Sequence, residues 1–310
     1  MKPEGTVVPL IRLNEDEVPK VLDEIVENIH GVLVGGRAGE GATMPIEELK
    51  KTIKAVKGHN SELAVYGGAW FIDGTGEDGF SKALAAQEAG ADYVVIPPPQ
   101  YDMDQGQILD LCLRFAKDSR IEIPRLLYVH PGDKNLFGFD TIKTLAKMDN
   151  IVGIKTSYDN FIWIDSLCRL PSSQSGRFNV LVGEEKQLFF GYLFGAKGNV
   201  STLAHLEAEK VTSLATKLQD FRIKRTQYYE DTLTYLREIA SDLKVLNLVK
   251  LKEKYNGGIY SGFLYGLKQS RELHDLFQQQ LDIIKLGNKI YKPDVLQGIR
   301  KNLKSRKILS

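Results

Sequence analysis

The chain has 310 residues, of which 43% are hydrophobic and 26% are charged, and its formal net charge at pH 7 is +1. A chain of this length can bury a large core, and its near-zero charge gives no bulk attraction for nucleic acid. No apolar run approaches the roughly 18 residues of a membrane span, and the N-terminus opens no signal sequence. We therefore expect a cytoplasmic protein that binds small molecules and neither nucleic acid nor a membrane.

Eight short runs rich in β-forming residues alternate with stretches of helical periodicity. This alternation predicts a parallel sheet, and eight units fit a closed (β/α)8 TIM barrel with its active site at the carboxyl ends of the strands. The structural alternative is an open doubly wound sheet, which would usually carry a nucleotide-binding loop after its first strand. The sequence has no such loop. The predicted strands are 6–10, 31–34, 63–66, 93–96, 125–129, 151–155, 180–182 and 198–200.

Beyond residue 223 the pattern becomes wholly helical. We expect 1–223 to form the barrel and 224–310 to form a C-terminal helical region packed on it, with an independent binding module as the alternative. An aromatic stripe that includes Tyr228 and Tyr235 would give this region an apolar face. The tail 285–310 is rich in lysine and arginine, which is typical of a solvated helix face. Its alternative role is contact with an acidic partner or nucleic acid.

Lys155 ends the apolar strand predicted at 151–155. An amine held at the mouth of an apolar pocket has a lowered pKa and becomes a nucleophile for carbonyl carbons, so Lys155 is a candidate Schiff-base lysine. Strand alternation places Gly153 on the same face, where it would leave room beneath the lysine stem, and places Val152 and Ile154 on the other face. The alternative is a strand-terminal lysine that extends into solvent.

The cysteines and histidines give no sign of a metal or a disulfide. Cys112 and Cys168 each stand alone in a helical pattern, which predicts packed free thiols. The five histidines are scattered without paired spacing, so we expect no zinc site. The segment 74–79 is rich in glycine, but it lacks the lysine of a phosphate loop and is better explained as the start of a helix.

Several segments, in their order and spacing, resemble the dihydrodipicolinate synthase and N-acetylneuraminate lyase family. The resemblance runs from about residue 5 to 215 and continues more faintly beyond. It rests on the segments 35–43, 88–95, 128–131, 153–155, 183–185 and 195–198.

This resemblance implies the chemistry of a class I aldolase without a metal or a dissociable cofactor. Lys155 would form an imine with pyruvate or a related 2-oxo acid, and the derived enamine would add to an aldehyde or arise from carbon–carbon cleavage. Tyr128 matches the family's catalytic tyrosine, the hydroxyl acid and base. Tyr101 matches a tyrosine that is lent across a dimer interface, although Gln100 departs from the pattern. A homo-oligomer, a dimer of dimers, is therefore expected.

Two departures from the family pattern concern the substrate. Arg37 and Ala38 stand where the family has a pair of hydroxyl residues, and Asp133 stands where the synthase branch has an arginine. Arg37 either binds a substrate carboxylate or pairs with Asp133, with a solvent-facing side chain as the remaining alternative. His130 shares a strand face with Tyr128 and is a further candidate for the site. The predicted substrate-binding residues are Arg37, Ala38, Gly39, His130, Asp133, Gly183 and Val200.

The sequence thus predicts a lyase or aldolase with catalytic residues Lys155, Tyr128 and Tyr101. Two alternatives stay open: a Schiff-base dehydratase or hydratase of sugar acids, and a non-catalytic paralogue that binds a metabolite.

Overall fold

The computed structural model describes residues 3–158, 160–224 and 271–290. Eight parallel strands close into a barrel in chain order, with β1 hydrogen-bonded to both β2 and β8. The barrel predicted from the sequence is therefore confirmed, and closure through β1 and β8 rules out an open sheet. The strands are β1 (Gly5–Pro9), β2 (Gly31–Val34), β3 (Ala64–Gly68), β4 (Tyr93–Ile96), β5 (Arg125–Val129), β6 (Ile151–Thr156), β7 (Asn179–Val182) and β8 (Gly198–Val200).

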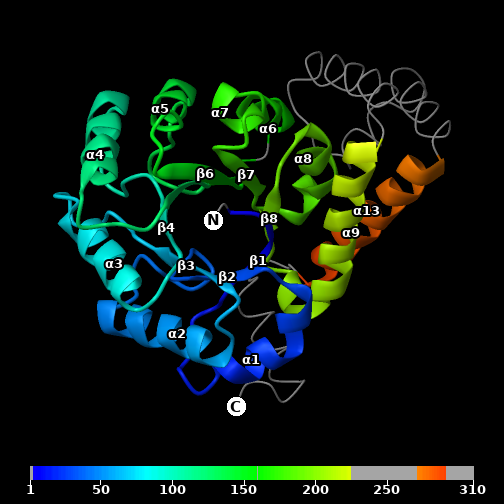
Figure 1. Cartoon of the computed structure of the whole chain (residues 1–310), viewed down its shortest axis with the longest axis horizontal. Helices are drawn as coiled ribbons and strands as arrows, with labels where there is room; N and C mark the ends of the chain where they lie inside the picture. The colour runs from blue at the N-terminus through cyan, green and yellow to red at the C-terminus, as the bar shows by residue number, and fades with distance from the viewer. Residues whose placement is uncertain (1–2, 159, 225–270, 291–310) are drawn as a thin grey trace.

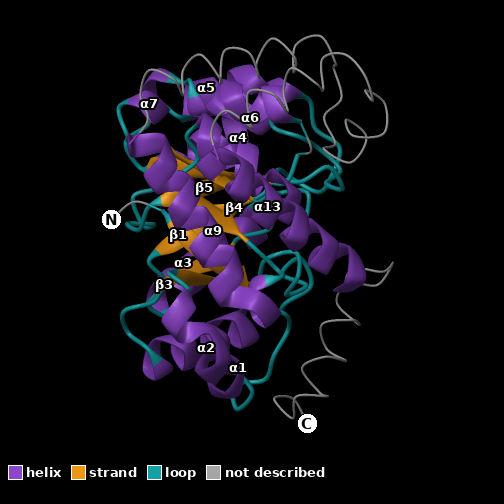
Figure 2. Cartoon of the chain, turned by 90° about the vertical axis from the view of Figure 1, so that its right-hand side faces the viewer, coloured by secondary structure: helices purple, strands orange, loops and turns teal. Residues whose placement is uncertain are grey.

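Helices surround this barrel, as Figures 1 and 2 show from two directions. Most lie between consecutive strands, which is the connection that parallel strands require. The segment 74–79 begins α3, where the Asp73 carboxylate accepts the first-turn amide of Asp78 at 3.1 Å. The helices are α1 (Val18–Ile25), η1 (Val26–Asn28), α2 (Ile46–His59), α3 (Glu77–Glu88), α4 (Gln105–Lys117), α5 (Phe139–Leu145), α6 (Phe161–Cys168), α7 (Pro171–Gln174), η2 (Glu185–Gln187), α8 (Leu188–Phe194), α9 (Ala204–Lys224) and α13 (Arg271–Ile290).

Alternating strand residues divide the hydrophobic core into two layers. On β4, Val95 belongs to an inner cluster, whereas Val94 and Ile96 belong to the layer between the strands and the helices. This is the period of two expected for a strand whose two faces are both buried. The inner cluster fills the barrel with Val7, Leu33, Tyr66, Trp70, Tyr93, Val95, Leu126, Tyr128, Val152, Leu181 and Val200.

Strand β6 departs from the predicted alternation. Arg125 pairs with Ile151, but its neighbour Leu126 pairs with Gly153, so the register skips Val152. Val152 lies in the inner cluster and Ile154 in the outer layer, so placing both on one face was wrong. An irregularity of this kind adds a residue to one strand and shifts the alternation beyond it. Lys155 nevertheless points inward, because the shift occurs before it.

The glycine at position 153 serves strand packing. A Cβ there would collide with the carbonyl oxygen of Asn179 on β7 and lie 2.8 Å from Leu126. The nearest atoms therefore belong to Asn179 and Leu126. The sequence pattern had instead predicted that this glycine leaves room for the Lys155 side chain. Glycine instead allows β7 to approach β6 closely.

The C-terminal helix α13 packs against the barrel's outer helices, beside α9 in Figure 1. The Phe189 and Phe277 rings lie 5.3 Å apart, and the buried Gln280 amide bonds to the Phe189 amide and the Glu185 carbonyl at 2.9 and 2.8 Å. The division at residue 223 stays a prediction. The tyrosine stripe and most of the basic tail fall outside the described residues. Within the described residues no helix is long and apolar enough to cross a membrane.

Candidate active site

Lys155 and Tyr128 face each other inside the barrel near the carboxyl ends of β6 and β5. They are register partners on adjacent strands, and the Lys155 Nζ lies 4.2 Å from the centre of the Tyr128 ring. Only 5% of Lys155 is exposed. Burial lowers the pKa of the Lys155 amine to about 8, against the opposing attraction of Glu184. A substantial fraction of this amine is therefore neutral near pH 8 and able to attack a carbonyl carbon.

The phenol of Tyr128 stays protonated. The residue is 2% exposed, and burial raises the pKa of its hydroxyl, although a hydrogen bond with Ser157 opposes the rise. A protonated hydroxyl beside a nucleophilic amine can donate a proton to an oxygen that leaves the attacked carbon.

The absence of a side chain at Gly183 leaves space for the Lys155 side chain. A Cβ on this glycine would lie 3.1 Å from Lys155 Cε and would collide with the Ser157 hydroxyl. The Gly183 amide donates to the Thr156 carbonyl at 2.8 Å, which holds the turn after β7 against the end of β6. Gly183 thus contacts the amine's own stem, and its predicted contact with substrate remains a prediction.

Arg37 and Asp133 form an ion pair between the β2–α2 and β5–α5 loops. The Asp133 side chain has no exposed surface, whereas that of Arg37 is 38% exposed. Burial raises the pKa of Asp133, and the guanidinium opposes that rise. The structure therefore shows the pairing alternative for Arg37 and excludes a side chain that only faces solvent. Its Nε is buried without a hydrogen-bond partner among the described residues.

His130 lies beside Tyr128, with 6.2 Å between the two ring centres. Its amide donates to Asp133 Oδ2 at 3.2 Å, and its Nδ1 accepts the Gly132 amide at 2.9 Å. Burial, followed by the charges of Arg37 and Lys155, lowers the pKa of the imidazole to about 4. The ring is therefore neutral at physiological pH, and it adds no positive charge that would compete with Arg37 for the Asp133 carboxylate.

The loop that carries Arg37, Ala38 and Gly39 is a compact turn. The Gly39 amide donates to the Gly36 carbonyl at 3.1 Å, and Glu40 has a left-handed φ of 56°. The Gly39 amide is thereby used within the turn rather than left free for a carboxylate. Beneath the turn, the Trp70 ring lies 5.7 Å from the Arg37 guanidinium carbon. Trp70 is a site residue that the sequence did not single out.

Comparison with known proteins decides the family of this chain. A family model described as the dihydrodipicolinate synthetase family matches residues 12–262. The chain belongs to this family. The 4-hydroxy-tetrahydrodipicolinate synthase of Methanothermobacter thermautotrophicus is 28% identical over 276 residues, which are 83% of this chain and 93% of that protein. The chain is accordingly a dihydrodipicolinate synthase-like lyase.

Two solved structures share the barrel fold. The dihydrodipicolinate synthase from Bacteroides thetaiotaomicron aligns with a TM-score of 0.74 at 20% identity, over 100% of this chain and 91% of its own. YagE, a prophage protein of the dihydrodipicolinic acid synthase family from E. coli K12, was solved in complex with pyruvate. It aligns with a TM-score of 0.65 at 21% identity, over 77% of this chain and 83% of its own.

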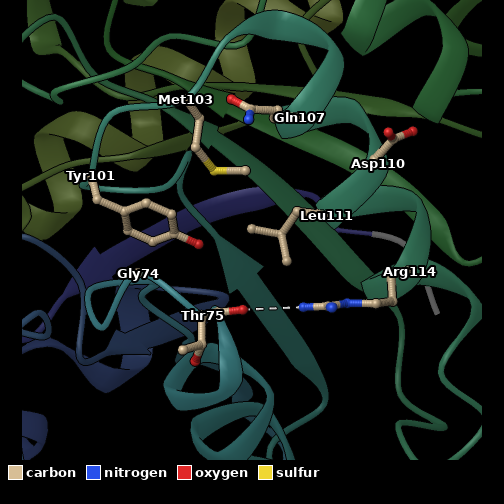
Figure 3. Close-up of a pocket in the computed structure, with 8 residues that line it drawn as sticks. All are labelled: Gly74, Thr75, Tyr101, Met103, Gln107, Asp110, Leu111 and Arg114. Atoms are coloured by element: carbon tan, nitrogen blue, oxygen red, sulfur yellow. Dashed lines mark hydrogen bonds between the residues drawn. The ribbon is translucent and has the colours of Figure 1, made fainter.

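In this dihydrodipicolinate synthase family member, Tyr101 lines a pocket of about 310 Å³ that does not include Lys155. Figure 3 shows its ring between α4 and the loop before α3, near Leu111. Burial, followed by the charges of Asp73 and Asp78, raises the pKa of its hydroxyl. The predicted catalytic role of Tyr101 in the site of a partner subunit remains a prediction.

The remaining predicted residue, Val200, lies inside the barrel on β8, 3% exposed. Sequence reasoning missed Ser157, whose amide donates to the Val129 carbonyl at 2.8 Å and whose hydroxyl meets Tyr128. Strand alternation held the signal, because Ser157 lies two residues beyond Lys155. The described residues contain no group of three histidine, cysteine, aspartate or glutamate side chains that could hold a metal ion.

Proposed function

We propose that the protein is a class I aldolase that forms an imine between Lys155 and pyruvate or another short 2-oxo acid. One observation carries this proposal: a buried amine with a pKa of about 8 lies against a protonated phenol at the carboxyl end of a barrel. Membership of the family and the pyruvate complex of YagE support pyruvate as the first substrate.

The proposed reaction begins when the neutral Lys155 amine attacks the keto carbon. The carbonyl oxygen takes up a proton, and water leaves as the iminium forms. Tyr128 would supply protons to the departing oxygen and take them back from the adjacent methyl carbon. Loss of that methyl proton gives an enamine, because the iminium accepts the electron pair. The enamine carbon then attacks an aldehyde, and hydrolysis of the new iminium releases the product and restores the amine.

The described site contains side chains for each of these reaction steps. Ser157 orients the Tyr128 hydroxyl, and Gly183 leaves space for the lysine stem. The charge of Arg37 acts on Lys155, so its guanidinium belongs to the same site. Asp133 pairs with this guanidinium, and the Nε–H has no hydrogen-bond partner among the described residues. We propose that this side of the site receives the 2-oxo acid carboxylate. The same steps in reverse cleave a carbon–carbon bond.

We further propose a homo-oligomer, a dimer of dimers, in which Tyr101 completes the site of a partner subunit. The support is the place of Tyr101, whose ring lies in a pocket beside α4 that Lys155 does not line. We propose the cytoplasm as its compartment, since Cys112 and Cys168 are both buried free thiols, as is usual in reducing surroundings.

Reduction with borohydride tests the proposed function directly. Pyruvate and borohydride should leave a covalent adduct on Lys155, identified by peptide mass, and Lys155→Ala should abolish it. Lys134→Ala is the matched control, because Lys134 lies on the exposed part of the β5–α5 loop in an ion pair with Asp102. An adduct on another lysine, or none with any 2-oxo acid of a panel, would overturn the proposal.

A further inference from the structure

A buried ammonium on α3 holds the loop that carries Arg37. Lys82 is 7% exposed, and its Nζ donates to the carbonyl oxygens of Gly41 at 2.8 Å and Ala42 at 3.2 Å. No carboxylate within the described ranges pairs with it at ion-pair distance. Burying an ammonium without a directly paired carboxylate is costly, and burial lowers the pKa of Lys82 although the charge of Asp78 opposes this effect. An apolar side chain could fill the same space at a lower cost in free energy. The two hydrogen bonds of Lys82 to the loop are therefore the feature that needs an explanation.

The loop closes on itself at the point where Lys82 holds it. The Gly41 amide donates to the Gly36 carbonyl at 3.0 Å, and a Cβ on Gly41 would collide with the Gly35 carbonyl. The indole of Trp70 donates to that same Gly35 carbonyl at 2.8 Å. Two donors from the β3–α3 unit therefore fix the two ends of the turn, Trp70 the first and Lys82 the second.

Arg37 projects from the turn between these two fixed ends. Its guanidinium lies over Trp70 and pairs with Asp133, which also accepts the amide of His130. A turn that shifts relative to β3 and α3 would carry Arg37 away from Asp133. Misplacement by about 1 Å is enough to change binding or reactivity severely.

We propose that Lys82 is a positioning residue: its buried ammonium, together with Trp70, fixes the base of the β2–α2 turn and so places Arg37 over Asp133 beside Lys155. The part of this proposal that concerns 2-oxo acid binding rests on the proposed function. The part that concerns the turn rests on the contacts of Lys82 and Trp70 and is independent of the reaction.

Hydrogen exchange measured by mass spectrometry tests the turn without any substrate. In Lys82→Met, which removes the donors and keeps the stem, amides in 36–45 should exchange roughly tenfold faster or more, because two hydrogen bonds at the base of the turn are lost. Exchange in β6 and β7 should stay unchanged. The control is Lys50→Met, which removes the exposed ion pair between α2 and Glu88 of α3. Equal exchange of 36–45 in Lys82→Met and the wild type would overturn the proposal.

Borohydride trapping separates positioning from a general loss of structure. In Lys82→Met the pyruvate concentration for half-maximal trapping at Lys155 should rise by roughly tenfold, whereas the limiting trapping rate should change by less than about threefold. An equal fall in the limiting rate with no change in half-saturation would count against positioning. If the wild type gave no adduct at all, the proposed function would fail, and the exchange experiment would still decide the role of Lys82.

A second variant covers the outcome in which Lys82→Met does not fold. Lys82→Arg keeps a cation with several donors, so it should restore slow exchange in 36–45 and half-saturation close to that of the wild type. Trp70→Phe removes the other donor and should loosen the same turn. If Lys82→Arg loosened the turn as much as the methionine variant did, or if Trp70→Phe left its exchange unchanged, the two-donor arrangement would be refuted.

Discussion

Tyr128 and Lys155 are register partners on adjacent strands, and the lysine Nζ lies 4.2 Å from the centre of the tyrosine ring. A ring face attracts a cation and so favours the charged amine. Burial acts in the opposite direction and is the stronger effect, since it lowers the pKa of the amine to about 8. Near pH 8 the amine is therefore present in comparable amounts as the charged ammonium and as the neutral nucleophile.

The rate of adduct formation should follow this pKa. Only the neutral amine attacks pyruvate, so the initial rate at Lys155 should rise between pH 6 and 8 and level off above about 8 to 9. An exposed lysine would continue to gain reactivity toward its ordinary pKa of about 10.4. The measurement is the initial rate of adduct formation across pH, with the reduction carried out at one fixed pH. A midpoint near 10 would contradict the burial effect.

Tyr128→Phe should slow proton transfer and leave the fold intact. The substitution keeps the ring in the inner cluster and removes the hydroxyl, so exchange of the pyruvate methyl protons with deuterated water should fall by roughly 10² or more. Nuclear magnetic resonance follows this exchange without a second substrate. Tyr192→Phe is the matched control, because its buried hydroxyl bonds to Asn199 on β8, outside the site. Near-normal exchange in Tyr128→Phe would assign the tyrosine to packing alone.

Arg37 and Asp133 should show non-additive effects. Arg37→Ala leaves a fully buried carboxylate without its partner and should lower the free energy of unfolding by about 1–3 kcal/mol, discounted for the partial exposure of Arg37. The double variant Arg37→Ala, Asp133→Ala should cost less than the sum of the two single variants. Denaturant unfolding and the half-saturating pyruvate concentration measure the two effects. Additive costs on both measures would mean that the pair is not coupled.

Gly183→Ala should impair imine formation at Lys155. The new methyl group would collide with the Ser157 hydroxyl and crowd Lys155 Cε at 3.1 Å, so the amine must move from its place beside Tyr128. Borohydride trapping should fall by roughly tenfold or more. The control is Gly58→Ala, since a methyl group at Gly58 on α2 meets nothing within 4 Å. Unimpaired trapping in Gly183→Ala would show that the turn can relax without displacing the amine.

His205 should make the protein sensitive to acid. Burial lowers the pKa of this imidazole to about 4, and its Nε2 lies 3.0 Å from the Pro9 carbonyl. The unfolded chain binds a proton at its ordinary pKa of about 6.5, so stability is lost as pH falls from about 6.5 toward 4. Between pH 7 and 5 this histidine should account for about 2 kcal/mol of the loss. His205→Gln should lose correspondingly less in urea unfolding at the two pH values, and parallel losses would contradict the assignment.

The arrangement of the barrel was predictable because its signals are local. Eight apolar runs separated by helical periods encode parallel pairing, and four of the predicted strands, such as 125–129, match their bounds in the structure. The inward position of Lys155 and its place next to Tyr128 follow from strand alternation and chain order. The free state of Cys112 and Cys168 was likewise evident from their isolated positions.

Tertiary structure decided what depends on contacts between distant segments. The irregular register at Val152 arises from pairing between β5 and β6, so alternation within one strand could not reveal it. The sequence was compatible with several roles for Arg37. Its ion pair with Asp133 forms only because folding brings together two loops whose paired residues are 96 positions apart in the chain. In the sequence Lys82 looks like an ordinary exposed helix lysine, and only the folded structure shows that its ammonium is buried and donates to the Gly41 carbonyl. Charge and hydrogen bonding act through space, and a sequence records spacing along the chain alone.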